Sequence, residues 1–252
     1  GRGLYIKIDF LLYAIAPGRR YDASVTTAQA LRRGVEIIRE CAGDKFILGC
    51  GTPLLQLIGL CDGMRIGPDV GSQWSFPLNH PAWPLGNCSI KPCARYAVYR
   101  HWQHRVLWQN DPDCLVVRDH ENGIEGNQFR KFFPHMDVRN ENFGLTDVEA
   151  SMWVKVIWFT GGMWFLSEDW ERLGEDRKQL VEMCVNPNPH PVRMTDYYAS
   201  YSVMVMESAD GVNQFAVINI DDKNAEVELD ASRYQLTEWT FREIFTGETF
   251  TG

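Results

Sequence analysis

Two carboxylates that each follow a short apolar segment stand out in the sequence. Asp9 comes directly after Leu4–Ile8, and Asp69 comes four residues after Arg65 in a second such segment. They are 60 residues apart, which matches about two βα units of roughly 30 residues each. Alternate strands of an α/β barrel point into the same layer, so Asp9 and Asp69 are expected to face one another at the barrel mouth. A facing carboxylate pair indicates glycoside hydrolysis.

A strand, a helix and a second strand are predicted to position Asp69. Residues 46–50 are a continuous apolar run, typical of a strand buried on both faces. Pro53 suits a first helical turn, and apolar residues then recur at helical spacing, at Leu54, Leu55, Leu57, Ile58 and Cys61. Residues 64–69 are predicted to be extended, so residues 46–69 are predicted to form a βαβ unit with Asp69 at the carboxyl end of its second strand.

The rest of the chain divides into an α/β part, a linker and a β part. The α/β part is predicted over 1–186, with strands at 4–9, 46–50, 64–69, 105–109 and 163–167 and with further helices at 23–41, 93–104, 145–159 and 170–184. The first of these helices is expected to begin at Asp22 or Ser24, and the third at Thr146 with Glu149 completing a capping box. The Asn-Pro repeats predict a linker at 187–194. Period-two segments at 201–206, 214–220, 225–229 and 234–241 then predict a small antiparallel β domain over 195–252.

Several motifs resemble one enzyme family. LYIKIDF at 4–10, CGTP at 50–53 and MRIGPDV at 64–70 resemble segments of glycoside hydrolase family 36, the α-galactosidases, and less closely family 27. LWQNDPD at 107–113 and FLSED at 165–169 continue the resemblance. It implies the C-terminal portion of a (β/α)₈ TIM barrel followed by a small antiparallel β-sandwich domain. It also implies that Asp9 ends the fourth strand, so the chain is expected to be a fragment that lacks three βα units.

The resemblance and the residues together assign roles. Asp9 is the expected nucleophile, and Lys7, on the same face of the strand, favours its ionised form. Asp69 is the expected general acid and then base, and a retaining mechanism needs the two carboxyl groups about 5–5.5 Å apart. The resemblance implies that Lys7 also donates to sugar hydroxyls, that Arg65 contacts the 2-hydroxyl region, and that Cys50 lines the substrate pocket.

Structural alternatives stay open for each of these residues. Asp9 could cap a loop, Asp69 could form a turn, Arg65 could pair with an acidic neighbour and Cys50 could fill the core. Asp111 and Asp113, at the end of another predicted strand, are rivals by position, although this segment is chiefly structural in the related families.

Aromatic and histidine residues give weaker signals. Trp74 and Trp83, in the loop over 70–92, are candidate sugar platforms or residues that pin the loop to the barrel. His101 and His104 are three residues apart, but no third ligand is evident, so surface or packed histidines are favoured over a metal site. No metal and no cofactor is expected.

The charge and the cysteine content limit the classes of binding partner and the compartment that fit this chain. The net charge of −8 and the pI near 5.3 argue against nucleic acid or an anionic membrane, and an uncharged oligosaccharide or galactoside fits better. Seven cysteines without metal-like pairs indicate reduced buried thiols, which slightly favours a cytoplasmic protein. No apolar run is long enough for a transmembrane helix. An open parallel edge in a partial barrel predicts a homo-oligomer or association with a missing N-terminal half.

Three functions therefore compete. The first is a retaining glycosidase that cleaves terminal α-D-galactosides through a glycosyl-aspartate; specificity for α-N-acetylgalactosaminides or β-L-arabinopyranosides instead is an open alternative. The second is a catalytically inactive, truncated remnant. The third is a sugar-binding module without hydrolysis.

Overall fold

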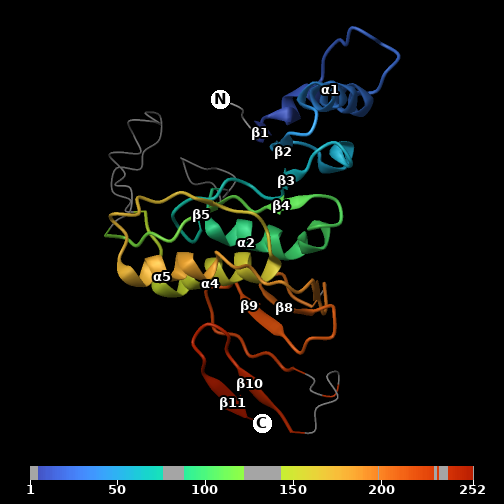
Figure 1. The fold of residues 1–252 in the computed structure, drawn as a ribbon. Coiled ribbons are helices and arrows are strands. Elements are labelled where there is room, and N and C mark those ends of the chain that lie inside the picture. The colour runs from blue at the N-terminus through green and yellow to red at the C-terminus, as the bar shows by residue number, and fades with distance from the viewer. Residues whose placement is uncertain are drawn as a thin grey trace.

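The computed structural model describes residues 5–75, 88–121, 143–197, 199–229, 232 and 238–251. Its first part contains a parallel sheet of four strands in chain order, formed by β1 (Tyr5–Ile8), β2 (Phe46–Gly49), β3 (Gly63–Arg65) and β4 (Gln109–Asp111). A second parallel pair joins β5 (Cys114–Leu115) to β6 (Phe165–Leu166). Strands β1 to β4 descend from the N-terminal part toward the middle of the molecule (Figure 1). Parallel order along the chain confirms the predicted α/β class, whereas closure into a barrel stays a prediction.

Helix α1 (Thr27–Ala42) connects β1 to β2 and follows the predicted apolar stripe. Its cap is Thr26, whose hydroxyl accepts from the Gln29 N–H at 3.3 Å in a capping box, so the prediction of a cap at Asp22 or Ser24 is wrong. Asp22 instead accepts hydrogen bonds from the backbone and the hydroxyl of Ser24, which form a separate turn.

Two predicted elements are shorter than expected or shifted. The helix predicted after Pro53 is only the 3₁₀ turn η2 (Leu54–Leu57), because the next residue is already extended and Gly59 has φ 79°. A similar 3₁₀ turn, η1 (Leu11–Ile15), follows β1. The strand predicted at 105–109 is wrong: Arg105 has φ 60° and its N–H closes a turn on the Trp108 carbonyl, so β4 begins only at Gln109.

Four further helical elements in the described residues of the first part follow β3 in the chain. They are α2 (Ile90–Tyr99), η3 (His101–Gln103), α4 (Asp147–Thr160) and α5 (Glu175–Met183). Helix α2 begins before the predicted residue 93, because Pro92 is accommodated in its first turn. The capping box of Thr146 and Glu149 on α4 is confirmed. Helix α5 begins later than predicted, after Gly174 in an extended conformation.

Antiparallel strands form the C-terminal part. β7 (Val192–Met194), β8 (Val203–Ser208) and β9 (Phe215–Asn219) make one sheet, and β10 (Thr240–Arg242) pairs with β11 (Thr249–Thr251). Strand β7 lies inside the range predicted as a linker, so that segment is already part of the sheet. The strand predicted at 225–229 is not formed. Residues 234–237 of the segment predicted at 234–241 lie outside the described residues, and β10 begins in the described half of that segment.

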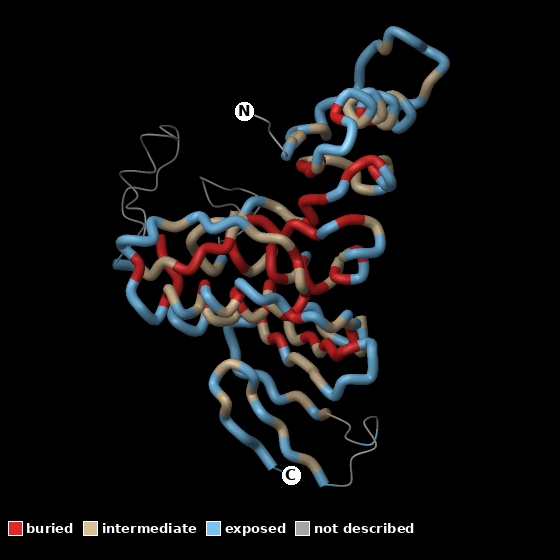
Figure 2. Tube along the Cα trace, in the orientation of Figure 1, coloured by how far each residue is buried: buried red, intermediate tan, exposed pale blue. Residues whose placement is uncertain are grey.

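One hydrophobic core joins the helices to the antiparallel sheet. Its buried side chains come from α2, α4, β8 and β9, with Trp153 of α4 fully buried among them. Figure 1 shows α2 and α4 between the parallel strands and the sheet of β8 and β9, and Figure 2 shows buried backbone running through these layers. A second core packs α1 against β2, β3 and Trp108. The β7–β9 sheet is therefore packed on the α/β part through shared apolar contacts.

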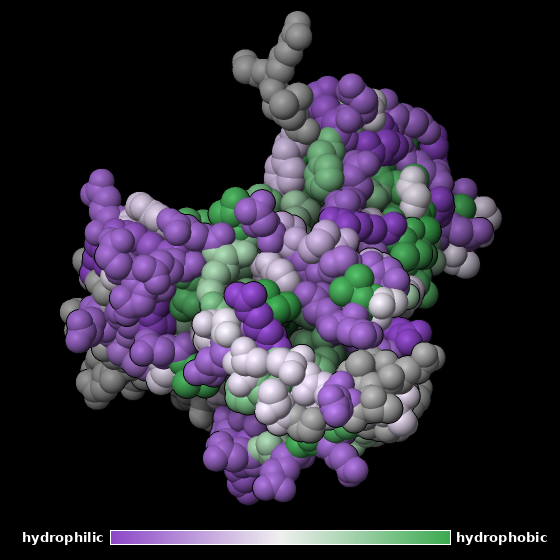
Figure 3. Space-filling view, turned by 60° about the horizontal axis from the view of Figure 1, so that its bottom comes forward, coloured by the Kyte–Doolittle hydropathy of each residue, from purple (hydrophilic) through white to green (hydrophobic). Residues whose placement is uncertain are grey.

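The N-terminal part also exposes large apolar side chains, namely Tyr5, Phe10, Leu12, Tyr13, Leu55 and Ile58. Figure 3 shows hydrophobic atoms at the surface of the lobe at upper right, which carries these elements, next to hydrophilic atoms. Among the described strands β1 pairs only with β2, so it lies at a sheet edge. The association expected from such an edge stays a prediction. No helix in the described part of the chain is long and apolar enough to cross a membrane.

Candidate active site

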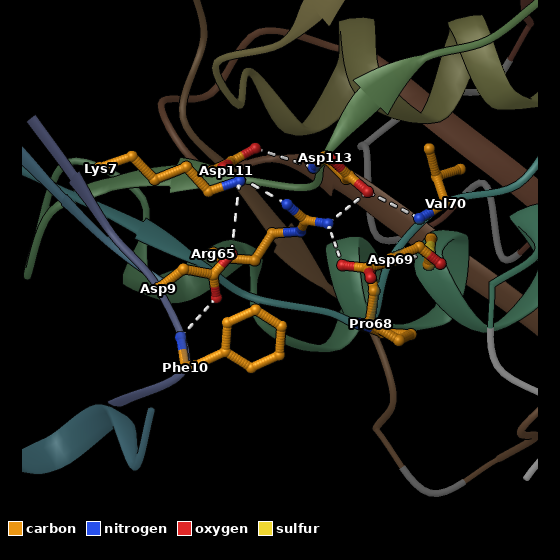
Figure 4. A network of polar contacts seen from close by, with 10 residues as sticks. Lys7, Asp9, Phe10, Arg65, Pro68, Asp69, Val70, Asp111 and Asp113 are labelled. Carbon is orange, nitrogen blue, oxygen red and sulfur yellow. Dashed lines mark hydrogen bonds and ion pairs between the residues drawn. The ribbon is translucent and has the colours of Figure 1, made fainter. Parts of the chain in front are cut away.

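Adjacent parallel strands bring a cluster of charged side chains together at their carboxyl ends. Lys7 lies on β1. Arg65 is the last residue of β3, and in the β3–β4 register it pairs with Asp111 on β4. Asp9 follows β1 directly. Figure 4 shows these side chains turned toward one another, with Arg65 between Asp9 on one side and Asp69 on the other. Lys7, Asp9 and Arg65 thus lie at one end of the sheet, whereas the expected facing of Asp9 and Asp69 across a barrel mouth stays a prediction.

Asp9 is held in its ionised form by its neighbours. Burial raises the pKa of Asp9, but hydrogen bonds from the Cys50 thiol and the Phe10 N–H, with the charges of Lys7 and Arg65, bring it below its ordinary value. The Phe10 N–H donates to Oδ1 at 2.7 Å, and Lys7 Nζ lies 4.0 Å from Oδ2. An anionic oxygen therefore remains available at the end of β1.

Cys50 is placed beside Asp9 by the next strand. Its N–H donates to the Ile8 carbonyl at 2.8 Å, which continues the β1–β2 pairing by one residue. Burial and the hydrogen bond to Asp9 raise the pKa of the Cys50 thiol to about 12, so the thiol stays protonated and donates. Gly51, with φ 52°, keeps the backbone close: an added Cβ there would lie 3.1 Å from Asp9 Oδ1. Cys50 contacts the site directly instead of filling a distant part of the core.

Arg65 is the buried cation of the cluster. Its side chain is 4% exposed, and its guanidinium pairs with Asp69 at 2.8 Å, with Asp113, and more distantly with Asp111 at 4.0 Å. Its Nε has no hydrogen-bond partner among the described residues. Arg65 therefore does pair with acidic neighbours, which is the structural alternative that the sequence left open. One of those neighbours is Asp69, the candidate acid.

Asp69 stands in a loop four residues after Arg65 and not at a strand end. Strand β3 stops at Arg65, so the prediction that the strand runs to Asp69 is wrong. Its side chain is 74% exposed, in contrast to the buried Arg65 that it contacts. A carboxyl group placed in this way can reach a ligand and is tethered by a guanidinium.

The rival carboxylates Asp111 and Asp113 lie behind Arg65. Burial raises the pKa of Asp111, against the opposing charge of Arg65, and its Oδ1 accepts from the Asp113 N–H at 2.8 Å. Asp113 Oδ2 accepts from the Val70 N–H at 2.6 Å. Both side chains are mostly shielded from solvent, at 1% and 11% exposed, so they support the cluster from within.

Trp74, His101 and His104 make hydrogen bonds to groups outside this cluster. Trp74 Nε1 donates to Asp222 Oδ1 at 3.2 Å, which favours the alternative that Trp74 pins its loop. Trp83 lies outside the described residues. His101 Nδ1 contacts the Val98 carbonyl at 2.6 Å, and His104 Nδ1 accepts from the Asn110 N–H. These ring nitrogens are therefore engaged by the backbone.

Cysteines and acidic groups give no metal centre in the described part of the chain. No three histidine, cysteine, aspartate or glutamate side chains described there could together hold a metal ion. All seven cysteines are free thiols, as predicted, although Cys41 is exposed and not buried. The chemistry that the cluster offers is that of an exposed carboxyl group beside a buried guanidinium and a second, ionised carboxylate.

Comparison with solved structures places this arrangement in a known fold. The chain is similar to TtGalA, an α-galactosidase from Thermus thermophilus in complex with p-nitrophenyl α-D-galactopyranoside, at 24% identity and a TM-score of 0.55 over 80% of this chain and 35% of that chain. It is also similar to α-galactosidase I from Mortierella vinacea, at 15% identity and a TM-score of 0.64 over 97% of this chain and 62% of that chain. A GH27 β-L-arabinopyranosidase from Geobacillus stearothermophilus matches at 14% identity and a TM-score of 0.61 over 98% of this chain and 52% of its own.

These comparisons establish a shared fold. No protein-family model matches the chain. The chain spans about a third of the length of the Thermus thermophilus enzyme, at 35%, and less than two thirds of the Mortierella vinacea enzyme, at 62%.

Proposed function

We propose that this chain carries the catalytic carboxylates of a retaining glycoside hydrolase that cleaves terminal α-D-galactosides. The observation that carries the proposal is that Asp9, directly after β1, and Asp69, in the loop after β3, lie on either side of Arg65 (Figure 4). The fold shared with two α-galactosidases supports the choice of substrate. In this proposal the parallel strands are the C-terminal portion of a (β/α)₈ barrel, as in family 36 or family 27, followed by a β-sandwich domain.

The reaction proceeds in two displacements. Asp9 attacks the anomeric carbon while Asp69 gives its proton to the departing glycosidic oxygen, so a glycosyl-aspartate forms and the aglycone leaves as a neutral alcohol. Asp69, now ionised, takes a proton from water, whose oxygen attacks the same carbon and releases Asp9. Two inversions give net retention, and each carboxyl group ends in the protonation state in which it began.

The local electrostatics suit these roles. A nucleophile must be ionised, and the lowered pKa of Asp9 meets that need at neutral and mildly acidic pH. Lys7 lies 4.0 Å from the Asp9 carboxylate and is 40% exposed, so it is also placed to donate to a sugar hydroxyl. Arg65 neutralises part of the charge around Asp69 as the reaction proceeds.

Turnover and its loss in single variants test the proposal. The purified chain is assayed with p-nitrophenyl α-D-galactopyranoside beside Asp9→Asn and Asp69→Asn, which are nearly isosteric and remove one ionisable group each. We expect each variant to lose at least about 100-fold in kcat/KM, the usual scale of acid–base and nucleophilic contributions. Full activity in either variant would refute the assignment of that carboxylate.

Stereochemistry and binding separate the alternatives. NMR of the first product should show the α anomer; the β anomer would indicate inversion and a carboxyl separation of roughly 6.5–9.5 Å. Saturable galactose binding without turnover by the unmodified chain would indicate a sugar-binding module, and neither binding nor turnover would indicate an inactive remnant. Parallel assays of α-N-acetylgalactosaminides and β-L-arabinopyranosides define the sugar.

A further inference from the structure

Asp113 and Asp111 are the two carboxylates of the cluster that the two displacements do not use, and Asp113 is the one that contacts the segment of Asp69. It lies two residues after β4, with a left-handed φ of 88° that is uncommon for a residue other than glycine. Its side chain is 11% exposed, against 74% for Asp69. A substrate that reaches Asp69 is therefore shielded from Asp113, and any contribution of Asp113 must act through other groups.

Its contacts lead to Asp69 by two routes. One oxygen of Asp113 accepts from the Val70 N–H at 2.6 Å, and Val70 is the residue that follows Asp69. The same oxygen pairs with Nη2 of Arg65, and that nitrogen also donates to Asp69 Oδ1 at 2.8 Å. Asp113 thus fixes both the backbone next to Asp69 and the guanidinium that touches its carboxyl group (Figure 4).

Asp113 is itself held rigidly. Its N–H donates to Asp111 Oδ1 at 2.8 Å, and Asp111 lies on β4, whose carbonyl accepts from the Ile66 N–H at 2.9 Å. The support for Asp69 therefore begins in the sheet and not in the loop that carries Asp69. If the Asp113 side chain is removed, the loop that carries Asp69 still has the contact between the Cys93 thiol and the Pro68 carbonyl, at 3.4 Å.

We propose that Asp113 is a positioning residue for Asp69, holding the acid's loop and its arginine so that the proton is delivered along the line of the departing oxygen. The inference rests on the proposed function. Proton transfer requires the acid within hydrogen-bond reach of the leaving group, and a displacement of about 1 Å can cost about 100-fold in rate.

Substrates that differ in their need for an acid test this role. Asp113→Ala is compared with the unmodified chain on phenyl α-galactoside, whose leaving group needs protonation, and on dinitrophenyl α-galactoside, whose leaving group does not. We expect kcat/KM to fall about 10- to 100-fold for the phenyl substrate and less than about threefold for the dinitrophenyl substrate. The control is Glu207→Ala, which removes another buried carboxylate paired with an arginine, 2.8 Å from Arg193, in the β7–β9 sheet.

A measurement without substrate checks the contact itself. The Val70 amide should exchange with solvent at least about tenfold faster in Asp113→Ala and at an unchanged rate in Glu207→Ala, because only the first variant removes its acceptor. If Asp113→Ala does not fold, Asp113→Asn keeps an acceptor oxygen and loses the charge, and it should lose about 3- to 10-fold on the phenyl substrate alone.

The outcomes separate the two proposals. Equal losses on both substrates, or a Val70 amide that is unchanged, would overturn the role of Asp113 while leaving the proposed function intact. If the unmodified chain hydrolyses neither galactoside, the proposed function fails and the catalytic part of this inference fails with it. A selective loss on the phenyl substrate together with faster Val70 exchange supports both.

Discussion

His104 gives the sharpest prediction about acid stability, because it ties the start of β4 to the preceding turn. Its Nδ1 accepts from the Asn110 N–H at 3.2 Å, so the ring must be neutral with its proton on Nε2. Nε2 has no hydrogen-bond partner among the described residues, and an added Cβ at Gly161 would lie 3.5 Å from it. Protonation would turn an acceptor into a donor that faces another donor.

The magnitude follows from the pKa. Burial, and secondly the charge of Arg105, lower the pKa of His104 from 6.5 to about 4. A proton therefore binds the unfolded chain more tightly than the folded one. The stabilising contribution is complete above the unfolded pKa and is lost as the pH falls from about 6.5 toward about 4. At about 1.36 kcal/mol per pKa unit, the loss between pH 8 and pH 4.5 is about 2.5 kcal/mol.

Urea unfolding followed by tryptophan fluorescence measures this loss. His104→Asn places an amide oxygen near the position of Nδ1, so it keeps an acceptor for the Asn110 N–H and cannot titrate. Other groups titrate equally in both proteins, so the difference in the free energy of unfolding isolates His104. Relative to the variant, the unmodified chain should lose about 2.5 kcal/mol from pH 8 to pH 4.5. A difference that stays constant over this range would refute the reasoning.

Two further predictions concern the surroundings of the site. Cys50→Ala removes a hydrogen bond that lowers the pKa of Asp9, so the acidic limb of the pH profile of kcat/KM should move to higher pH. Cys50→Ser keeps a hydrogen-bond donor, and its pH profile should stay near that of the unmodified chain. An unchanged profile in the alanine variant would contradict this role of Cys50. Asp222→Ala removes the acceptor of the Trp74 indole N–H at 3.2 Å, so amide hydrogen exchange in the loop of Trp74 should become faster. The free energy of unfolding should fall by less than about 1 kcal/mol, because the Asp222 carboxylate is exposed. An equal effect of Lys223→Ala would count against a specific contact.

The end of the parallel sheet was accessible to sequence reasoning. The apolar run at 4–8 predicts a strand that ends at Asp9, and β1 does end directly before Asp9, whereas β3 stops at Arg65, four residues before the Asp69 that the sequence places at its end. Alternation along a strand likewise placed Lys7 on the face of Asp9. Both inferences depend only on strand direction and period, which the apolar runs define.

Strand β4 shows where apolar patterns fail. Its residues Gln109, Asn110 and Asp111 are polar, yet Asn110 and Asp111 are buried, because Asn110 donates to the Arg100 carbonyl at 2.9 Å and Asp111 faces Arg65. A period-two apolar signal is absent there, so the sequence predicts the strand at 105–109, over the more apolar residues just before β4. Buried polar strands become visible only when their partners, which are distant in sequence, are known.

The C-terminal sheet contributes to the site by the same kind of distant contact. Asp222, in the turn after β9, accepts from Trp74 and pairs with Lys91 at 3.3 Å, at the start of α2. Asp113 holds Val70 from the other side, so the segment that carries Asp69 is anchored both to the parallel sheet and to the antiparallel one. A single apolar core also joins α2 and α4 to β8 and β9. The antiparallel part therefore belongs to the framework around the candidate acid, even though none of its described side chains is among the charged groups of the cluster.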